Sequence, residues 1–256
     1  MTRAGSLAFC AALTTAMTLL GCSSSTRAGA DSGSGSEADG GKPASPATLR
    51  QFESGAEAMS ESARGTLPGH IPDWPTAKMA YVEDNTLWQG LKAQLNSAGA
   101  TAATLRAIDA ALAAYAIDLS NMDQRGAETD ANKITIAIPD AFDVFTYTAP
   151  TDTLRLDGGF RELQIDAEYS DWAGCANALE ATITIWTRLK VPVAAQAPKR
   201  PDIAGSATVV ADVDATIQGA QAIIADDGGV ALDSANLEQL AQKGLDQTDT
   251  CEQIFK

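Results

Sequence analysis

Apolar residues recur at intervals of three and four along most of the chain after residue 75. This spacing places them on one face of an α-helix. The clearest example is residues 105–122, where alanine fills many of the remaining positions and favours helix further. The pattern therefore predicts a body of packed helices. Similar stripes occupy residues 81–95, 172–186, 210–224 and 237–254.

Two further stretches fit more than one secondary structure. Residues 134–138 alternate as in a strand, but Ile134 and Ile138 also share a helix face with Phe142. Residues 154–166 fit either a helix or a short hairpin that turns at the glycine pair. We favour helix in both cases because the neighbouring segments are helical. The predicted fold is all-α, a single bundle of about six mostly antiparallel helices. We find no period of roughly 34 residues and no repeat signature.

The segment before the body is polar. Residues 23–48 contain no large apolar side chain, so they cannot bury enough surface to offset the entropy of ordering. In the following segment, Phe52, Ala56 and Met59 have helical spacing, which fits either a short docked helix or a continuation of the tether. The predicted organisation is a signal peptide (1–21), a lipidated cysteine with a disordered tether (22–50), a partly ordered lead-in (51–74) and a helical domain (75–256).

The N-terminal run has the form of an export signal. Arg3 precedes an uncharged apolar stretch that is too short for a comfortable membrane span of about 20 residues. The stretch ends in Leu-Leu-Gly-Cys at residues 19–22, which resembles the lipobox of bacterial lipoproteins. The resemblance implies cleavage before Cys22 and membrane attachment through acyl groups on that residue. Ser23 follows, which in this class implies outer-membrane sorting if the host is Gram-negative. The alternative is an ordinary signal peptide cut elsewhere, with Cys22 as a plain thiol.

The chain is strongly acidic, with 33 Asp and Glu against 18 Lys and Arg and a net charge of −15. Such a surface repels nucleic acid and anionic lipid, so we expect no nucleic-acid partner. The sequence also lacks a phosphate-cradling loop, a Gly-x-Ser-x-Gly elbow and a His-Glu-x-x-His motif. We therefore expect no cofactor, no metal and no catalytic residue.

His70 is the only histidine and lies in the segment GHIPDWP. Imelysin-type periplasmic proteins carry a helical Gly-x-His-x-x-Glu pattern, but here Gly69 adjoins His70 directly and Pro72 would break a helix. We do not carry a metal role over from that family, and we place His70 in a loop. Trp74 is expected to pack on the end of the first bundle helix. The alternative for Trp74 and His70 is contact with a partner protein.

Cys175 and Cys251 are the cysteines that remain once the leader and Cys22 are set aside. An exported chain with two thiols suggests a disulfide, and this alternative stays open. We favour buried free thiols because both residues lie on or beside apolar stripes. The predicted topology also places them near opposite ends of the bundle, beyond the roughly 7 Å limit between Cα atoms.

Carboxylates are plentiful, but nothing in the sequence marks a cleft that would bring a catalytic pair together. We interpret most of them as solvated helix residues. The pair beside Pro139 is the exception kept open, because a proline kink would free backbone carbonyls there. The groupings considered are Asp140 with Asp143, Asp157 with Glu162 and Asp166, and Asp212 with Asp214.

These observations favour a lipid-anchored protein of the bacterial cell envelope whose helical domain binds or scaffolds an envelope protein partner without catalysis. The alternative is a periplasmic accessory protein that binds a solute or a metal ion through acids near Pro139 or between helices. A third interpretation is an envelope enzyme that uses carboxylates alone.

Overall fold

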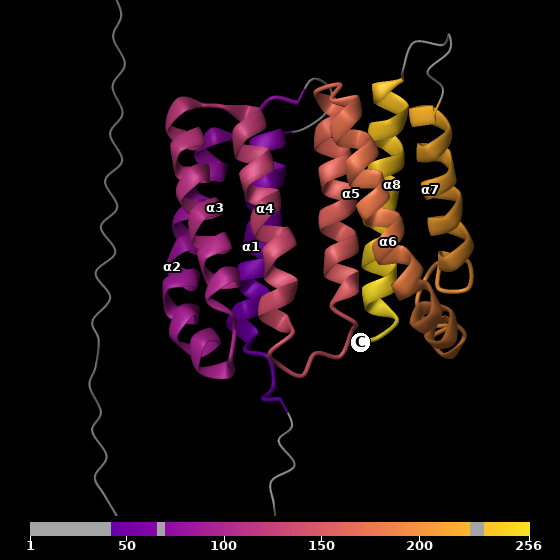
Figure 1. Cartoon of the computed structure of the whole chain (residues 1–256), viewed down its shortest axis with the longest axis horizontal. Coiled ribbons are helices and arrows are strands. Elements are labelled where there is room, and N and C mark those ends of the chain that lie inside the picture. Colours follow the sequence, from indigo (N-terminus) through magenta and orange to yellow (C-terminus); the bar gives the residue numbers. More distant parts are fainter. Residues whose placement is uncertain (1–41, 66–69, 226–232) are drawn as a thin grey trace, which may run out of the picture. The chain divides into compact units, whose positions relative to one another are not determined.

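The computed structural model describes residues 42–65, 70–225 and 233–256. The all-α prediction is confirmed, and apart from one isolated β-bridge the regular structure of these residues is helical. The helices are α1 (Ala47–Arg64), α2 (Trp74–Ala98), α3 (Ala102–Asn121), α4 (Gln124–Phe142), α5 (Asp152–Glu168), α6 (Trp172–Gln196), α7 (Val209–Ala225) and α8 (Ser234–Gln253), with a 3-10 turn η1 (Ala197–Lys199) after α6 (Figure 1).

Four of the helices begin at an aspartate that caps the free N–H groups of the first turn. The carboxylates of Asp73, Asp123, Asp171 and Asp233 each accept a hydrogen bond from the backbone N–H three residues further on, at 3.0–3.1 Å. This is the usual geometry of an aspartate N-cap and stabilises a helix start by about 1 kcal/mol. These caps fix the first residues of α2, α4, α6 and α8.

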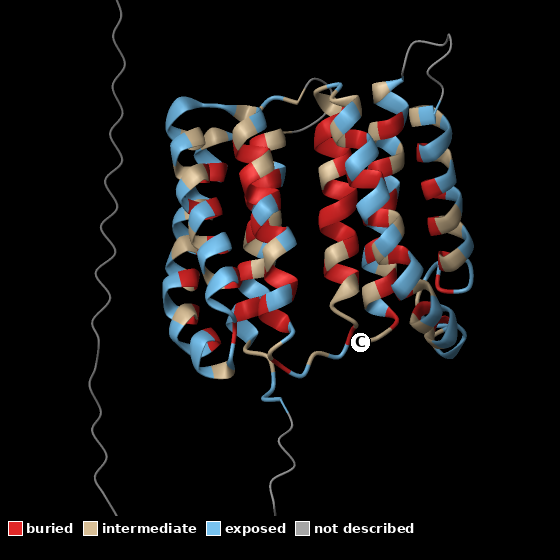
Figure 2. Ribbon diagram, in the orientation of Figure 1, coloured by how far each residue is buried: buried red, intermediate tan, exposed pale blue. Residues whose placement is uncertain are grey.

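The helices form two groups of four, each around its own apolar core (Figure 1). In the first group, α1 packs on α2 and α4, and α3 packs on α4 and α2. In the second group, α5 packs on α6 and α8, and α7 packs on α8 and α6. The groups meet where α4 lies against α5, and both of these helices are buried along much of their length (Figure 2). The expected single bundle is therefore a pair of adjacent four-helix bundles.

The two halves repeat the same arrangement down to single hydrogen bonds. In α2, the sequence WQGLK contains Trp88 and Lys92. The indole Nε1 of Trp88 donates to the carboxylate of Asp109 on α3 at 2.7 Å, and the amine of Lys92 donates to the same carboxylate at 2.9 Å. In α6, the sequence WTRLK repeats this contact to Asp214 of α7, at 2.8 Å from Trp186 and 2.6 Å from the lysine amine. The second and third helices of each half are thus joined by the same Trp–Asp–Lys link.

The buried positions of the three other helix pairs agree with this correspondence. The core positions of α1 (Phe52, Ala56, Met59, Ala63) match those of α5 (Leu156, Phe160, Leu163, Ala167) at the same intervals. Helices α3 and α7 match in the same way, with Ile108, Ala111, Leu112 and Tyr115 corresponding to Val213, Thr216, Ile217 and Ala220. Helices α4 and α8 also match, with Ala127, Ala131, Ile134, Ile138 and Ala141 corresponding to Leu237, Ala241, Gly244, Thr248 and Cys251. We infer that the body is a tandem repeat of one four-helix unit, which the search for a short period missed.

One expected boundary is wrong, and two open alternatives are decided in favour of the helices that we preferred. Helix α1 belongs to the body, because Leu49 and Phe52 are fully buried in the first core, so the predicted boundary at residue 75 falls too late. The alternative hairpin at 154–166 is not formed, because α5 runs through the whole segment, and residues 134–138 lie within α4. The predicted signal peptide, Cys22 and most of the tether lie outside the described residues.

Among the described residues, no helix combines the length and the apolar character needed to cross a membrane.

Candidate binding site between the two halves

Charged side chains gather where α1 of the first half faces α5 and α8 of the second. We call this region the polar seam, and it has two parts. One part is the His70 cluster, made of Arg64, His70, Gln124, Glu168 and Glu238. The other is a cavity of about 210 Å³, named here the seam cavity. It is lined by Glu57, Ser60, Glu61, Arg64, Asp157, Arg161, Gln164, Gln242, Leu245, Asp246 and Asp249.

Arg64 is the centre of the His70 cluster. It is the last residue of α1, and its guanidinium donates to Glu168 at 3.1 Å and also to Glu238. His70 Nε2 lies 3.1 Å from a carboxylate oxygen of Glu238, and its Nδ1 lies 3.8 Å from one of Glu168. The side chain of Gln124 donates to the backbone carbonyls of Arg64 and His70 at 3.1 and 3.2 Å. These contacts join Arg64 and His70 to the starts of α4 and α8 and to the end of α5.

The repeat explains which residues meet in the cluster. Arg64 and Glu168 are the last residues of α1 and α5, and Glu128 and Glu238 occupy the same position in α4 and α8. Arg64 at the end of α1 pairs with Glu238 at the start of α8. The equivalent contact between the end of α5 and the start of α4 brings two acids together, Glu168 and Glu128. Burial, and then the charge of Glu168, raise the pKa of Glu128 to about 8. Within the His70 cluster itself, the two carboxylates of Glu168 and Glu238 share one guanidinium, that of Arg64.

The seam cavity is also predominantly acidic. Five carboxylates line it, and two guanidinium groups oppose them. Of the two, Arg64 is already bonded to Glu168 and Glu238 outside the cavity. Arg161 contacts the buried Asp157 at 3.4 Å and lies 3.8 Å from Glu57, while its Nε is buried without a hydrogen-bond partner.

The pKa values of the cavity acids reflect this excess of negative charge. Burial, and then the neighbouring carboxylates of Asp157 and Glu53, raise the pKa of Glu57 to about 8. The pKa of Asp249 is raised by burial and by Asp157 in the same way. Like charges that share a poorly solvated site disfavour ionisation, and a bound cation would relieve the repulsion.

Most of the other acids considered from the sequence have partners outside the seam. Asp140 and Asp143, beside Pro139, both bind Arg155, at 2.7 and 2.6 Å. The other predicted groupings do not come together as sites. Asp157 lies in the seam, Glu162 accepts a hydrogen bond from Asn132, Asp166 lies 3.9 Å from Arg125, and Asp214 belongs to the Trp–Asp–Lys link.

The predicted cysteine and tryptophan residues have structural surroundings. Cys175 of α6 and Cys251 of α8 are buried free thiols, so the disulfide considered from the sequence does not form. They occupy the positions of Ala77 and Ala141 in the first half, which are small apolar core residues. Trp74 is partly buried and packs on the first core.

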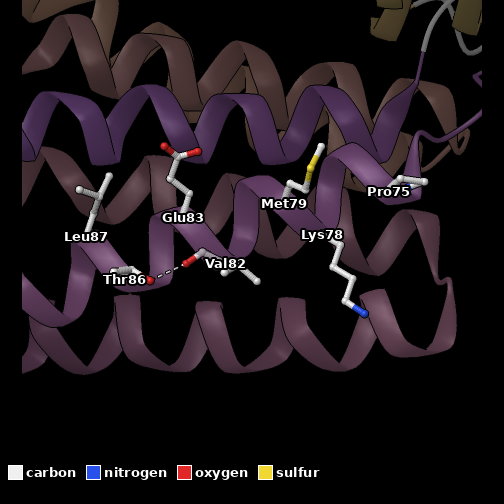
Figure 3. Close-up of a pocket in the computed structure, with 7 residues that line it drawn as sticks. All are labelled: Pro75, Lys78, Met79, Val82, Glu83, Thr86 and Leu87. Carbon is white, nitrogen blue, oxygen red and sulfur yellow. Dashed lines mark hydrogen bonds between the residues drawn. The ribbon is translucent and has the colours of Figure 1, made fainter. Parts of the chain in front are cut away.

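A larger hollow of about 530 Å³ is an open groove along α2, and it differs in character from the seam. It is lined by Pro75, Lys78, Met79, Val82, Glu83, Thr86 and Leu87 (Figure 3). Met79 and Val82 are 66% and 57% exposed. The hydroxyl of Thr86 is satisfied within the helix by the carbonyl of Val82. The groove therefore offers apolar contact and few groups that would orient a polar ligand.

Sequence reasoning singled out His70 but not the residues that surround it. Glu168 and Glu238 lie on helices distant in sequence, and only the pairing of the two halves brings them to the α1–α2 connection. The signal that was available is the repeat itself, since DW followed by W-x-x-L-K occurs once in each half. Comparisons with protein-family models, curated proteins and solved structures found no match to this chain.

Proposed function

We propose that this chain is a lipid-anchored protein of the bacterial cell envelope that binds, without catalysis, a small solute carrying protonated amines. The observation that carries the proposal is the seam cavity, in which five carboxylates face two arginines that already have acidic partners. A polar cavity needs a ligand of complementary charge to orient it. This develops the solute-binding alternative, with the ligand between the halves and not at Pro139.

The size and charge of the seam cavity limit the ligand. A volume of about 210 Å³ corresponds to roughly seven water molecules. A linear diamine of a few carbons fits that volume. One amine would reach the inner carboxylates, Asp157 and Glu57, and the other would reach Asp246 or Asp249 at the exposed rim. Gln164 and Gln242 add neutral hydrogen-bonding groups to the wall.

Calorimetric titration with putrescine, cadaverine and spermidine tests the proposal. We expect saturable binding at a single site, weakened at least tenfold in the double variant Asp246→Asn/Asp249→Asn. Glu180→Gln, which removes one exposed acid on α6, should bind as the parent does. 1,4-Butanediol, which has the shape of putrescine but no charge, should not bind. Equal affinity of the parent and the double variant for every amine, or no binding at all, would refute the proposal.

The pH dependence supplies an independent check. Because the pKa of Glu57 is about 8, this group is largely protonated at neutral pH and loses its proton when a cation binds. A primary amine stays protonated up to about pH 10. Affinity for putrescine should therefore rise between about pH 6.5 and pH 8.5, with proton release into the buffer. A Glu57→Gln variant should show a smaller rise, because Asp157 and Asp249, whose pKa values burial also raises, remain in the cavity.

The anchoring part of the proposal rests on Leu19-Leu20-Gly21-Cys22 and on the polar segment after it. Several acyl chains on one cysteine hold a protein durably at a membrane, since each buried methylene contributes about 0.8 kcal/mol. Mass spectrometry of the mature chain should find Cys22 acylated at its N-terminus. In a Gram-negative host we place the protein on the outer membrane, facing the periplasm or the surface. A Cys22→Ser variant should be recovered in the soluble fraction.

A further inference from the structure

The His70 cluster has the composition of a metal site as well as that of an ion-pair network. One imidazole nitrogen and one oxygen from each of Glu168 and Glu238 lie within 4.8 Å of one another. All three side chains are largely removed from solvent, with exposed fractions of 18%, 9% and 16%. They come from the α1–α2 connection and from two helices of the other half, so the packing of the halves preassembles them.

We propose that His70, Glu168 and Glu238 bind a divalent transition-metal ion, for which Zn²⁺ is the appropriate probe. A nitrogen ligand with two carboxylates suits zinc, and three protein ligands leave one position of a tetrahedral ion open to water. The two flanking carboxylates would supply the negative charge that a divalent ion needs. This site is separate from the proposed amine ligand in the seam cavity.

Two buried atoms without partners support a ligand at this place. The Nδ1 of His70 has no hydrogen-bond partner, although the ring lies between two carboxylates. Glu128, fully buried beside Glu168, has one carboxylate oxygen bonded to the Tyr169 hydroxyl at 3.2 Å and the other without a partner. Buried polar atoms are nearly always paired with protein, water or an ion. An ion between His70 and the two carboxylates would satisfy the imidazole nitrogen and offset the charge of Glu168 and Glu238.

Arg64 is the resident counter-ion of the two carboxylate ligands, and this makes the proposal sharply testable. Its guanidinium donates to Glu168 Oε2 and to Glu238 Oε1. A metal ion would compete with it for these oxygens. Removal of Arg64 should therefore strengthen metal binding, whereas in a purely structural ion-pair network it would only destabilise the fold.

The experiment is zinc titration of the chelator-treated mature chain, by calorimetry and by competition with a chromophoric chelator. We expect one equivalent to bind, and the affinity to fall at least tenfold in His70→Asn and in Glu238→Gln. Arg64→Met should bind zinc more tightly than the parent, by tenfold or more. Glu180→Gln serves as the charge-matched control and should leave the affinity unchanged.

Circular dichroism of each variant establishes that it is folded, and Arg64→Met keeps the test informative if a ligand variant is not. Absence of stoichiometric binding in both the parent and Arg64→Met would overturn the proposal. So would equal affinity of the parent, His70→Asn and Glu238→Gln. Amine binding is measured on the same chain in the presence of EDTA, so a failure of the metal site is distinguishable from a failure of the proposed function.

Discussion

Asp84 is an ionisable residue at a position where the second half has a neutral one. It lies on α2 against Gly55 of α1, and its counterpart Thr182 lies on α6 against Gly159 of α5. A Cβ at Gly55 would lie 1.7 Å from the Asp84 carboxylate, and one at Gly159 would lie 2.6 Å from the Thr182 hydroxyl. Each glycine thus makes room for a polar side chain from the next helix. Thr182 donates to its own helix backbone, whereas one oxygen of Asp84 has no partner.

The environment of Asp84 predicts a pH dependence of stability. Burial, and then the charge of Glu83, raise the pKa of Asp84 from 3.8 to about 8. A carboxyl whose pKa is raised by folding stabilises the folded state below the unfolded pKa, and this contribution is lost as the pH rises through the folded value. The free energy of unfolding should therefore fall between about pH 4 and pH 8.

Replacement of Asp84 by threonine, the residue of the second half, should remove this part of the pH dependence. Between pH 4 and about pH 9, the free energy of unfolding should fall by a few kcal/mol less in the variant than in the parent, since one pKa unit corresponds to about 1.4 kcal/mol. Urea unfolding at several pH values measures the difference. Glu180→Gln is the control, and an unchanged pH slope in Asp84→Thr would show that the carboxyl is not the cause.

At the scale of the helices, α5 and α8 pack so closely that a glycine is required between them. A Cβ at Gly244 of α8 would lie 2.4 Å from the ring of Phe160, which is fully buried and cannot move aside. Gly244→Ala should therefore lower the free energy of unfolding by about 1–3 kcal/mol. Gly90→Ala on α2 is the matched control, because nothing lies within 4 Å of its Cβ position. It should be neutral or stabilise by about 0.5–1 kcal/mol. Equal effects in chemical denaturation would contradict this account.

The helices themselves were predictable because their apolar stripes have the correct period. The stripe at 172–186 lies within α6, and the stripe at 105–122 runs along α3 to its C-cap residue, Met122. The strand alternative at 134–138 arose from Ile136, which lies off the core stripe of α4, is 46% exposed and faces Gly158 of α5. Helix α1 was undervalued for a different reason. Its apolar stripe is narrow and its remaining residues are polar. The sequence does not show that α2 and α4 provide an apolar surface on which Phe52 can pack.

The candidate site was less accessible to prediction than the fold. Each of its acids looks like an ordinary solvated helix residue, since Glu57, Asp157 and Asp246 lie on separate helices among other polar residues. Their meaning depends on which helix faces meet, and that is set by the α4–α5 contact between the halves. What marks that contact is the burial of α4 and α5 on more than the faces that pack in their own bundles, and this burial is visible only in the structure.

For the molecule as a whole, the α4–α5 contact determines whether two bundles behave as one cooperative unit. Asn132 of α4 donates to Glu162 of α5 at 2.6 Å and to the carbonyl of Gly158 at 3.1 Å. A Cβ at Gly158 would lie 2.9 Å from the side chain of Ile136, so the helices approach closely. Separation of the halves would expose these polar groups together with the sides of two largely buried helices. We therefore expect the halves to unfold together, although each has its own core.

Equivalent core residues of the two halves provide a matched test of this cooperativity. Ile108 of α3 and Val213 of α7 are fully buried and occupy the same position in the repeat. Ile108→Ala should cost about 2–5 kcal/mol, and Val213→Ala somewhat less because fewer methyl groups are lost. Under cooperative unfolding, either change should reduce the hydrogen-exchange protection of the slowest amides equally in α4 and α5. If Ile108→Ala lowered protection in α4 while α5 kept its parental value, the halves would be independent, and a ligand held between them could not depend on a preassembled seam.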